Sequence, residues 1–169
     1  MNKPITLEEL LASRDERHAR QMRLLEEQPD KTLVCLTVVM TGSVKRNELS
    51  LVVAHAAVEA LHKSFSPEEG EMTERDLETG YEAYLLTNIA EREAKLICCD
   101  IEDQHPLGRL FDIDVIRHDG SPMSRSSVGR SARKCLLCDN EARYCMRNHS
   151  HTQEELHQYI HQLIEQYVH

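Results

Sequence analysis

The chain is predicted to form a single α/β or α+β domain over residues 1–169, with a small mixed sheet of about three or more strands flanked by helices and a helix at each terminus. Three observations predict this fold class. The length suits one domain that can bury a sizeable core. Runs rich in β-branched residues alternate with runs of helical periodicity. Capping-box patterns precede the first and the last helical runs.

The first half of the chain is predicted to contain two helices separated by one strand. Thr6 followed by Glu9 forms a capping-box pattern, so a helix is expected to begin at about Leu7. Residues 32–40 are rich in β-branched side chains, which predicts a buried strand. Apolar residues then recur at helical spacing over residues 47–65, which predicts an amphipathic helix.

Polar side chains interrupt the expected buried face of the first helix, among them Arg14, His18 and Gln21. Two interpretations stay open. In the first, this is a surface helix whose arginines extend along the surface into solvent. In the second, Arg14 and its neighbours Arg17 and Arg20 point into a ligand site.

The rest of the chain is predicted to alternate between strands and helices. Its elements are, in order, an exposed polar connection at 66–80, a strand at 84–89, a helix at 90–103, a turn at 105–108, a strand at 110–116, a helix at 131–147 and a C-terminal helix after the capping box of Thr152 and Glu155.

The charge of the chain is unevenly distributed. The net charge of -9 argues against nucleic acid as a partner, since such binding needs a basic surface. Residues 109–147, however, hold eight basic and five acidic side chains, a net charge of +3 that leaves -12 on the remainder. A local phosphate site in an acidic protein is therefore plausible.

The sequence predicts a cytoplasmic protein without a membrane anchor. No run approaches the roughly 18 apolar residues that span a bilayer, and the first residues are charged too early for a signal peptide. In a reducing compartment, the six cysteines are expected to be buried thiols, metal ligands or redox groups rather than a disulfide framework.

Asp112 and Asp114 are the strongest candidates for chemistry. Residues two apart on a strand share a face, so the two carboxylates project together. Such a pair suits Mg²⁺ with substrate phosphates, although it could also be the polar face of an ordinary strand. Basic residues that suit phosphate surround the pair, and they favour the site interpretation: Lys45, Arg109, Arg125, Arg130, Arg133 and Lys134.

Three cysteines and a histidine follow the Asp pair at short spacings. Cys135, Cys138, Cys145 and His149, with His151 close by, match the ligand types of a structural zinc site. If residues 131–147 form one helix, the same cysteines would lie near one face as buried free thiols. We favour buried thiols and keep structural zinc as the alternative.

At these residues the sequence resembles the citrate lyase holo-acyl-carrier-protein synthases, also called apo-citrate lyase phosphoribosyl-dephospho-coenzyme A transferases. The resemblance covers nearly the whole chain. Its most specific segments are HPLGR-x2-DIDV at 105–115 and the C-x2-C segment at 135–138, supported by segments at 13–21, 36–45 and 124–125.

The resemblance implies an enzyme that moves a phosphoribosyl-dephospho-coenzyme A group from triphosphoribosyl-dephospho-coenzyme A to a serine of the citrate lyase acyl carrier protein, the gamma subunit, releasing pyrophosphate. The Asp pair and its neighbouring arginines suggest catalytic roles for Arg109, Asp112 and Asp114, of which the two aspartates would hold Mg²⁺. The residues expected to contact substrate are Arg14, Arg17, Lys45, His105, Arg125 and Arg133.

Two other functions remain as alternatives. One is a noncatalytic protein-binding module stabilised by zinc at the cysteine cluster. The other is a nucleotidyltransferase with a different acceptor, such as the carrier protein of malonate decarboxylase. Hydrolase, P-loop and dinucleotide-binding motifs are absent from the sequence.

Overall fold

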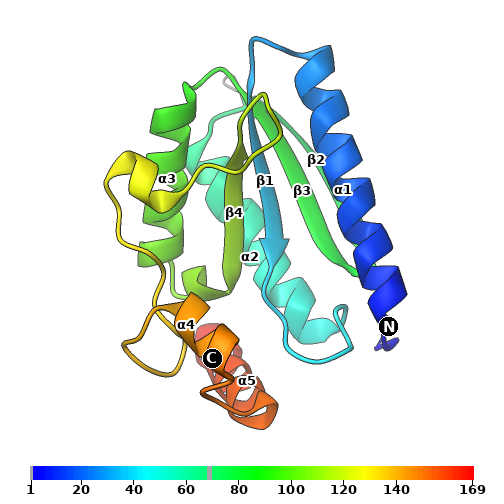
Figure 1. The fold of residues 1–169 in the computed structure, drawn as a ribbon, viewed down its shortest axis with the longest axis vertical. Coiled ribbons are helices and arrows are strands. Elements are labelled where there is room, and N and C mark those ends of the chain that lie inside the picture. The colour runs from blue at the N-terminus through cyan, green and yellow to red at the C-terminus, as the bar shows by residue number, and fades with distance from the viewer. Residues whose placement is uncertain (1, 68–69) are drawn as a thin grey trace.

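The computed structural model describes residues 2–67 and 70–169, and in this part of the chain helices pack on a four-stranded sheet with the strand order β2-β3-β1-β4 (Figure 1). The elements are α1 (Leu7–Glu27), β1 (Thr32–Val38), α2 (Glu48–Ser64), β2 (Gly70–Leu77), β3 (Gly80–Thr87), α3 (Glu91–Gln104), β4 (Phe111–Ile116), α4 (Ala142–Asn148) and α5 (Gln153–Val168), with short 3-10 turns at Gly108–Leu110 and Arg125–Val128.

The predicted fold class and the helices at both termini are confirmed. All strand pairs in the described chain are antiparallel, where we expected a mixture of directions. The reason lies partly in the β2–β3 connection, because Leu77 pairs with Gly80 across a two-residue turn and a turn this short can join only antiparallel strands.

Helices α1, α2 and α5 begin at side-chain caps. The Thr6 hydroxyl accepts a hydrogen bond from the Glu9 backbone N–H at 3.1 Å and opens α1. Thr152 and Glu155 form the reciprocal capping box of α5. Asn47 caps α2 in the same way with Ser50. None of the helices in the described residues is long and apolar enough to cross a membrane.

The two faces of the sheet differ in cover. On one face, the large hydrophobic core joins strand residues such as Leu36, Leu85 and Ile113 to α2, α3 and α5. On the other face, a smaller cluster joins Leu25 of α1 to Cys35 and neighbouring strand residues. Figure 1 shows α2 behind the sheet, α1 on the near side, and α4 and α5 together at one end.

The exposed connection predicted at 66–80 is wrong for most of its length, since Gly70–Leu77 forms strand β2. Residues 68 and 69 lie outside the described residues. β2 is an edge strand, and Glu71, Glu74, Arg75 and Asp76 give it a charged surface. Charged side chains protect an edge from unwanted strand pairing, and they also remove the apolar alternation that identifies a strand.

The helix predicted at 131–147 is also wrong, because only Ala142–Asn148 is helical. Residues before α4 form an irregular loop that bonds to itself. The Cys135 N–H donates to the Asn140 carbonyl at 2.7 Å, and the Ala142 N–H donates to the Arg133 carbonyl at 2.9 Å. These backbone groups therefore have partners across the loop instead of one helical turn away.

β4 is the second edge of the sheet, and side chains and a neighbouring segment bond to three of its outward backbone groups. The Ile113 N–H donates to the Glu102 carboxylate at 2.9 Å. The Phe111 carbonyl accepts from Arg133 at 2.6 Å. The Val115 carbonyl accepts from the Met123 N–H at 2.8 Å. The strand that carries the predicted Asp pair is therefore fixed from both sides.

Candidate functional site

Asp112 and Asp114 lie on the face of β4 opposite the buried Ile113. In register with β1, Asp112 lies beside Thr37 and Asp114 lies beside Cys35. Asp112 is exposed, whereas Asp114 is partly buried. The strand thus presents two carboxylates on one face, as the sequence spacing predicts.

The pair opens into a cleft of about 640 Å³. Two basic residues predicted to contact substrate, Arg125 and Arg133, line the same cleft. So does Lys95 of α3, whose side chain is only 4% exposed. The other lining residues are Val39, Glu102, Ile113, Met123, Ser124, Ser126, Ala132, Glu141, Ala142, Arg143 and Met146.

Asp114 sits in an environment that disfavours its negative charge. Burial is the main cause that raises its pKa from the ordinary value of 3.8 to about 6, and repulsion from Asp112 adds to it. Lys95 and Arg17 act in the opposite direction. A bound cation would relieve the repulsion between the two carboxylates.

Glu102 organises the basic side of the cleft. Its side chain is 4% exposed, and its carboxylate lies 2.9 Å from Arg125 and 3.4 Å from Arg133. Arg125 also pairs with Asp103 at 2.9 Å, while Arg133 donates to the Gly108 carbonyl at 2.9 Å. Both arginines are therefore held in place before any ligand arrives.

Arg17 and Arg14 occupy different environments on α1. Arg17 donates to the buried Glu82 carboxylate on β3 at 3.2 Å and is close enough to Asp114 to lower its pKa. Arg14 is exposed and lies near Lys45. Arg17 therefore points toward the sheet, whereas Arg14 lies on the surface of the helix.

Lys45 and Arg109 line a second cavity of about 480 Å³ beside the cleft. Lys45 donates to the Met40 carbonyl at 2.9 Å, and burial, with help from Arg14, lowers its pKa. Arg109 donates to the carbonyls of Lys134 and Cys135, so it holds the cysteine loop and does not line the Asp cleft. Val39, Arg133, Ala142 and Met146 line both cavities.

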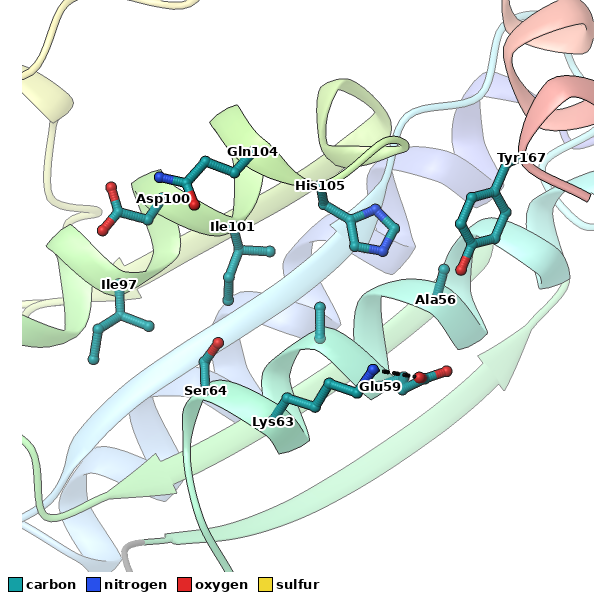
Figure 2. Close-up of a pocket in the computed structure, with 11 residues that line it drawn as sticks. Ala56, Glu59, Lys63, Ser64, Ile97, Asp100, Ile101, Gln104, His105 and Tyr167 are labelled. Atoms are coloured by element: carbon teal, nitrogen blue, oxygen red, sulfur yellow. Dashed lines mark ion pairs between the residues drawn. The ribbon is translucent and has the colours of Figure 1, made fainter.

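The structure places His105 away from the Asp pair. Figure 2 shows it facing Tyr167 across a pocket that residues of α2 and α3 also line. Its ring lies 4.8 Å from the Phe111 ring and 5.6 Å from the Tyr167 ring, and its Nδ1 accepts the Leu107 N–H at 2.9 Å. These contacts hold the turn before β4 and its packing on α5.

The backbone at Gly108, beside Arg109, packs closely against the backbone of α3. A Cβ at this position would lie 2.3 Å from the Glu102 carbonyl oxygen and 2.7 Å from that of Ile101. The glycine therefore lets the turn pack on the end of α3.

Cys135, Cys138, Cys145 and His151 form a cluster that could hold a metal ion, the one such group found in the described residues. The predicted fourth ligand, His149, is wrong. His149 ends α4 with a left-handed backbone (φ 49°) and an exposed side chain. The chain reverses at this residue, so the histidine two positions later approaches the cysteines.

A family model described as apo-citrate lyase phosphoribosyl-dephospho-CoA transferase matches residues 5–167. The chain belongs to this family. The predicted family and the predicted class of enzyme, a transferase, are confirmed.

Similar curated proteins carry related names. The chain is 34% identical over 164 residues to a probable apo-citrate lyase phosphoribosyl-dephospho-CoA transferase of Streptococcus pyogenes serotype M18, covering 95% of this chain and 85% of that protein. It is 37% identical over 155 residues to the transferase of Citrobacter koseri, covering 90% and 84%. Protein CitXG of Haemophilus influenzae is also 37% identical over 155 residues, but the chain spans only 33% of its length.

Sequence reasoning missed Lys95 and Glu102 as parts of these sites, and it named His151 only as a neighbour of the cysteine cluster. Lys95 and Glu102 are seven residues apart and lie among the buried residues of α3, including Cys98 and Cys99. A lysine and a glutamate that occupy positions on the apolar face of a helix indicate a buried polar site, because such groups are seldom buried without a partner. The spacing of Cys145 and His151 in the sequence does not predict that the two residues meet, because their contact depends on the turn at His149.

Proposed function

We propose that this chain transfers the phosphoribosyl-dephospho-coenzyme A group from triphosphoribosyl-dephospho-coenzyme A to a serine of the acyl carrier protein, the gamma subunit, of citrate lyase, with release of pyrophosphate. The observation that carries the proposal is the Asp112–Asp114 pair, which faces a cleft lined by the buried Lys95 and the partly buried Arg125 and Arg133, in a chain that matches the transferase family over residues 5–167.

The carboxylate pair fits Mg²⁺. Its donors are hard oxygens on one strand face, and burial together with repulsion from Asp112 raises the pKa of Asp114. Mg²⁺ is commonly held by one or two carboxylates together with substrate phosphates and water. In the proposed site Asp112 and Asp114 hold the ion, which when bound would neutralise charge that develops on the phosphates.

The chemical step is attack of the carrier serine on the α-phosphorus of the substrate. A new bond forms between the serine oxygen and phosphorus, and the bond from phosphorus to pyrophosphate breaks. The serine proton passes to one of the two carboxylates, Asp112 or Asp114, which acts as the general base. The nucleophile belongs to the partner, so the enzyme needs no activated serine or cysteine of its own.

The basic residues have distinct proposed roles. Lys95, Arg125 and Arg133 line the cleft, and they stabilise the phosphate charge there. Arg17 approaches the pair from α1. Arg109 is a positioning residue, since its guanidinium donates hydrogen bonds to the carbonyls of Lys134 and Cys135 in the loop before α4. His105 lies in another pocket, and we leave it out of the reacting site.

The second cavity suits the remainder of this long substrate. It joins the Asp cleft through four shared residues, and apolar side chains such as Leu136 and Leu156 line it beside Lys45 and Lys134. A dephospho-coenzyme A moiety has both apolar and phosphate parts, which match this combination. We propose that this moiety occupies the second cavity while the triphosphate occupies the cleft.

The proposed cellular setting is the cytoplasm. All six cysteines are free in the described chain, and the net charge of -9 disfavours nucleic acid as a partner. The acidic surface also disfavours attachment to anionic lipid headgroups.

Intact-mass spectrometry of the apo carrier protein tests the function directly. The carrier is incubated with the enzyme, Mg²⁺ and triphosphoribosyl-dephospho-coenzyme A. We expect a mass gain equal to the prosthetic group, loss of the gain with a chelator, and restoration by excess Mg²⁺. The carrier protein of malonate decarboxylase, tested in parallel, distinguishes the two acceptors.

The outcomes separate cleanly. No gain on either carrier, with folded enzyme and intact substrate, contradicts the proposed reaction. A gain only on the malonate decarboxylase carrier keeps the chemistry and replaces the acceptor. A mass gain on the carrier that persists in the presence of a chelator shows that the reaction does not need Mg²⁺.

A further inference from the structure

Four soft ligand atoms converge at the end of the sheet. The Sγ atoms of Cys135, Cys138 and Cys145 and a ring nitrogen of His151 all lie within 4.8 Å of one another. The Sγ atoms of Cys138 and Cys145 are 3.4 Å apart. This is far longer than a disulfide bond of about 2.05 Å, and close to the roughly 3.8 Å between two thiolates on a tetrahedral ion with metal–sulfur bonds of about 2.3 Å.

The surroundings of the cluster leave polar groups that a metal would satisfy. Cys135 and Cys145 are buried, and the Nε2 atom of His151 is buried without a hydrogen-bond partner. The Leu137 N–H points at the Cys135 Sγ from 3.4 Å, an arrangement that stabilises a thiolate. A buried histidine nitrogen without a partner is costly, and coordination would remove the cost.

We infer that Cys135, Cys138, Cys145 and His151 bind one structural zinc ion, which fixes the loop and helix that form the wall shared by the Asp cleft and the second cavity. Three thiolates and one imidazole in a closed arrangement are the donor set of structural zinc. Soft sulfur ligands disfavour magnesium and calcium.

The zinc holds the shared wall because its ligands lie at both ends of that wall. Cys135 and Cys138 come from the irregular loop, Cys145 comes from α4, and His151 follows α4. Ala142 and Met146, which line both cavities, lie between the first and the last ligand in the chain. α4 has only seven residues, too few to be stable on its own, so cross-linking by zinc contributes to its order.

Zinc content compared between two histidine variants tests the ligand set. The full chain is purified under reducing conditions from cells grown with zinc, and the metal is measured by mass spectrometry after challenge with a chromogenic chelator. We expect about one zinc per chain for the wild type and for His149→Asn. His151→Asn and Cys138→Ser should lose most of the ion. Asn tolerates the left-handed backbone at position 149, so this control preserves the turn.

Cobalt substitution identifies the ligands independently of activity. Co²⁺ bound in place of zinc is expected to show thiolate charge-transfer bands and the visible bands of a tetrahedral site, both weakened in Cys138→Ser. Wild-type chain that binds neither ion contradicts the inference. So does equal zinc loss from His149→Asn and His151→Asn, or a Cys138–Cys145 disulfide in protein kept reduced.

Limited trypsin digestion tests whether zinc holds the wall. Arg133, Lys134 and Arg143 provide cleavage sites within the segment. We expect stripping of zinc to speed cleavage there about tenfold or more, as local opening becomes easier, while far-ultraviolet circular dichroism keeps most of its helix signal. Equal cleavage with and without zinc contradicts the local role, and so does loss of the entire fold on stripping.

Discussion

The Asp cleft and the cysteine cluster lie side by side but are built in different ways. Asp112 and Asp114 take their spacing from a regular strand, and three of its outward backbone groups bond to Glu102, Arg133 and Met123. The four cluster residues lie in a loop, a short helix and a turn. Backbone regularity positions the first site, whereas the second depends on an irregular path that its ligand stabilises.

This difference predicts different responses to damage. The Asp cleft should keep its geometry without a ligand and should lose that geometry when side chains that hold β4, such as Glu102, are removed. The cluster should fail when its metal is removed, while the sheet stays intact.

Removal of Glu102 should have the largest effect on the strand-built site. Glu102→Ala leaves the Ile113 N–H without its acceptor and removes the common partner of Arg125 and Arg133. We expect a loss of about 3–5 kcal/mol in the free energy of unfolding, typical of a broken buried ion pair. Urea denaturation measures this. Asp103→Ala is the control, because Asp103 is exposed and should cost less than about 1 kcal/mol. Equal losses would show that Glu102 does not support the strand.

Asp112→Asn should abolish most catalysis while it preserves the fold. Asp112 is exposed on the strand, so the change removes a proposed metal ligand without a loss of packing. We expect transfer to slow on the order of a hundredfold or more, as for other groups that stabilise transition-state charge, and the same for Asp114→Asn. Rates come from intact-mass time courses. Asp30→Asn, an exposed turn residue, should leave the rate unchanged. Near-normal turnover of a folded Asp112→Asn enzyme would remove the pair from the mechanism.

Asp114→Asn should stabilise the protein when divalent cations are absent. The folded pKa of Asp114 is raised to about 6 from 3.8, so between these pH values the folded state binds more protons than the unfolded state, and stability falls as pH rises. Asparagine avoids this loss. With allowance for partial exposure, we expect a gain of about 1–2 kcal/mol at pH 7 that disappears below about pH 4. Thermal unfolding at both pH values checks this, and a pH-independent difference would contradict it.

Arg143→Glu should have the smallest effect. Arg143 is exposed on α4 at the cleft, in the basic stretch of an otherwise acidic protein. If this surface receives an acidic carrier protein, charge reversal should raise KM for the carrier by several-fold and leave the stability within about 0.5 kcal/mol. Carrier titrations at two salt concentrations measure it, with Arg23→Glu as an exposed control on α1. An unchanged KM would show that the carrier protein does not dock at the surface around Arg143.

The sequence predicts those parts of the fold whose geometry repeats. α2, α5, β1 and β4 follow from periodicity and caps, and the Asp pair follows from the alternation of side chains along a strand. β2 was missed because its charged residues lack apolar alternation. Residues 131–147 were predicted as one helix, although the N–H groups of Cys135 and Ala142 bond across a loop.

The remaining errors concern residues brought together by folding. His149 is closer to Cys145 in the chain, yet the left-handed turn at His149 brings His151 to the cluster. Lys95 lies in a helix seventeen residues before Asp112, and it enters the cleft because α3 packs along β4. Neither placement follows from local spacing, because each depends on the direction of the chain after a turn.

The occupied edge of β4 limits how an acceptor protein can reach the cleft. The Ile113 N–H and the carbonyls of Phe111 and Val115 already bond to Glu102, Arg133 and Met123, which disfavours extension of the sheet by a visiting strand beside the Asp pair. In the proposed reaction the carrier serine would then arrive on a projecting loop or at the tip of a helix, recognised by side chains and shape and not by backbone pairing.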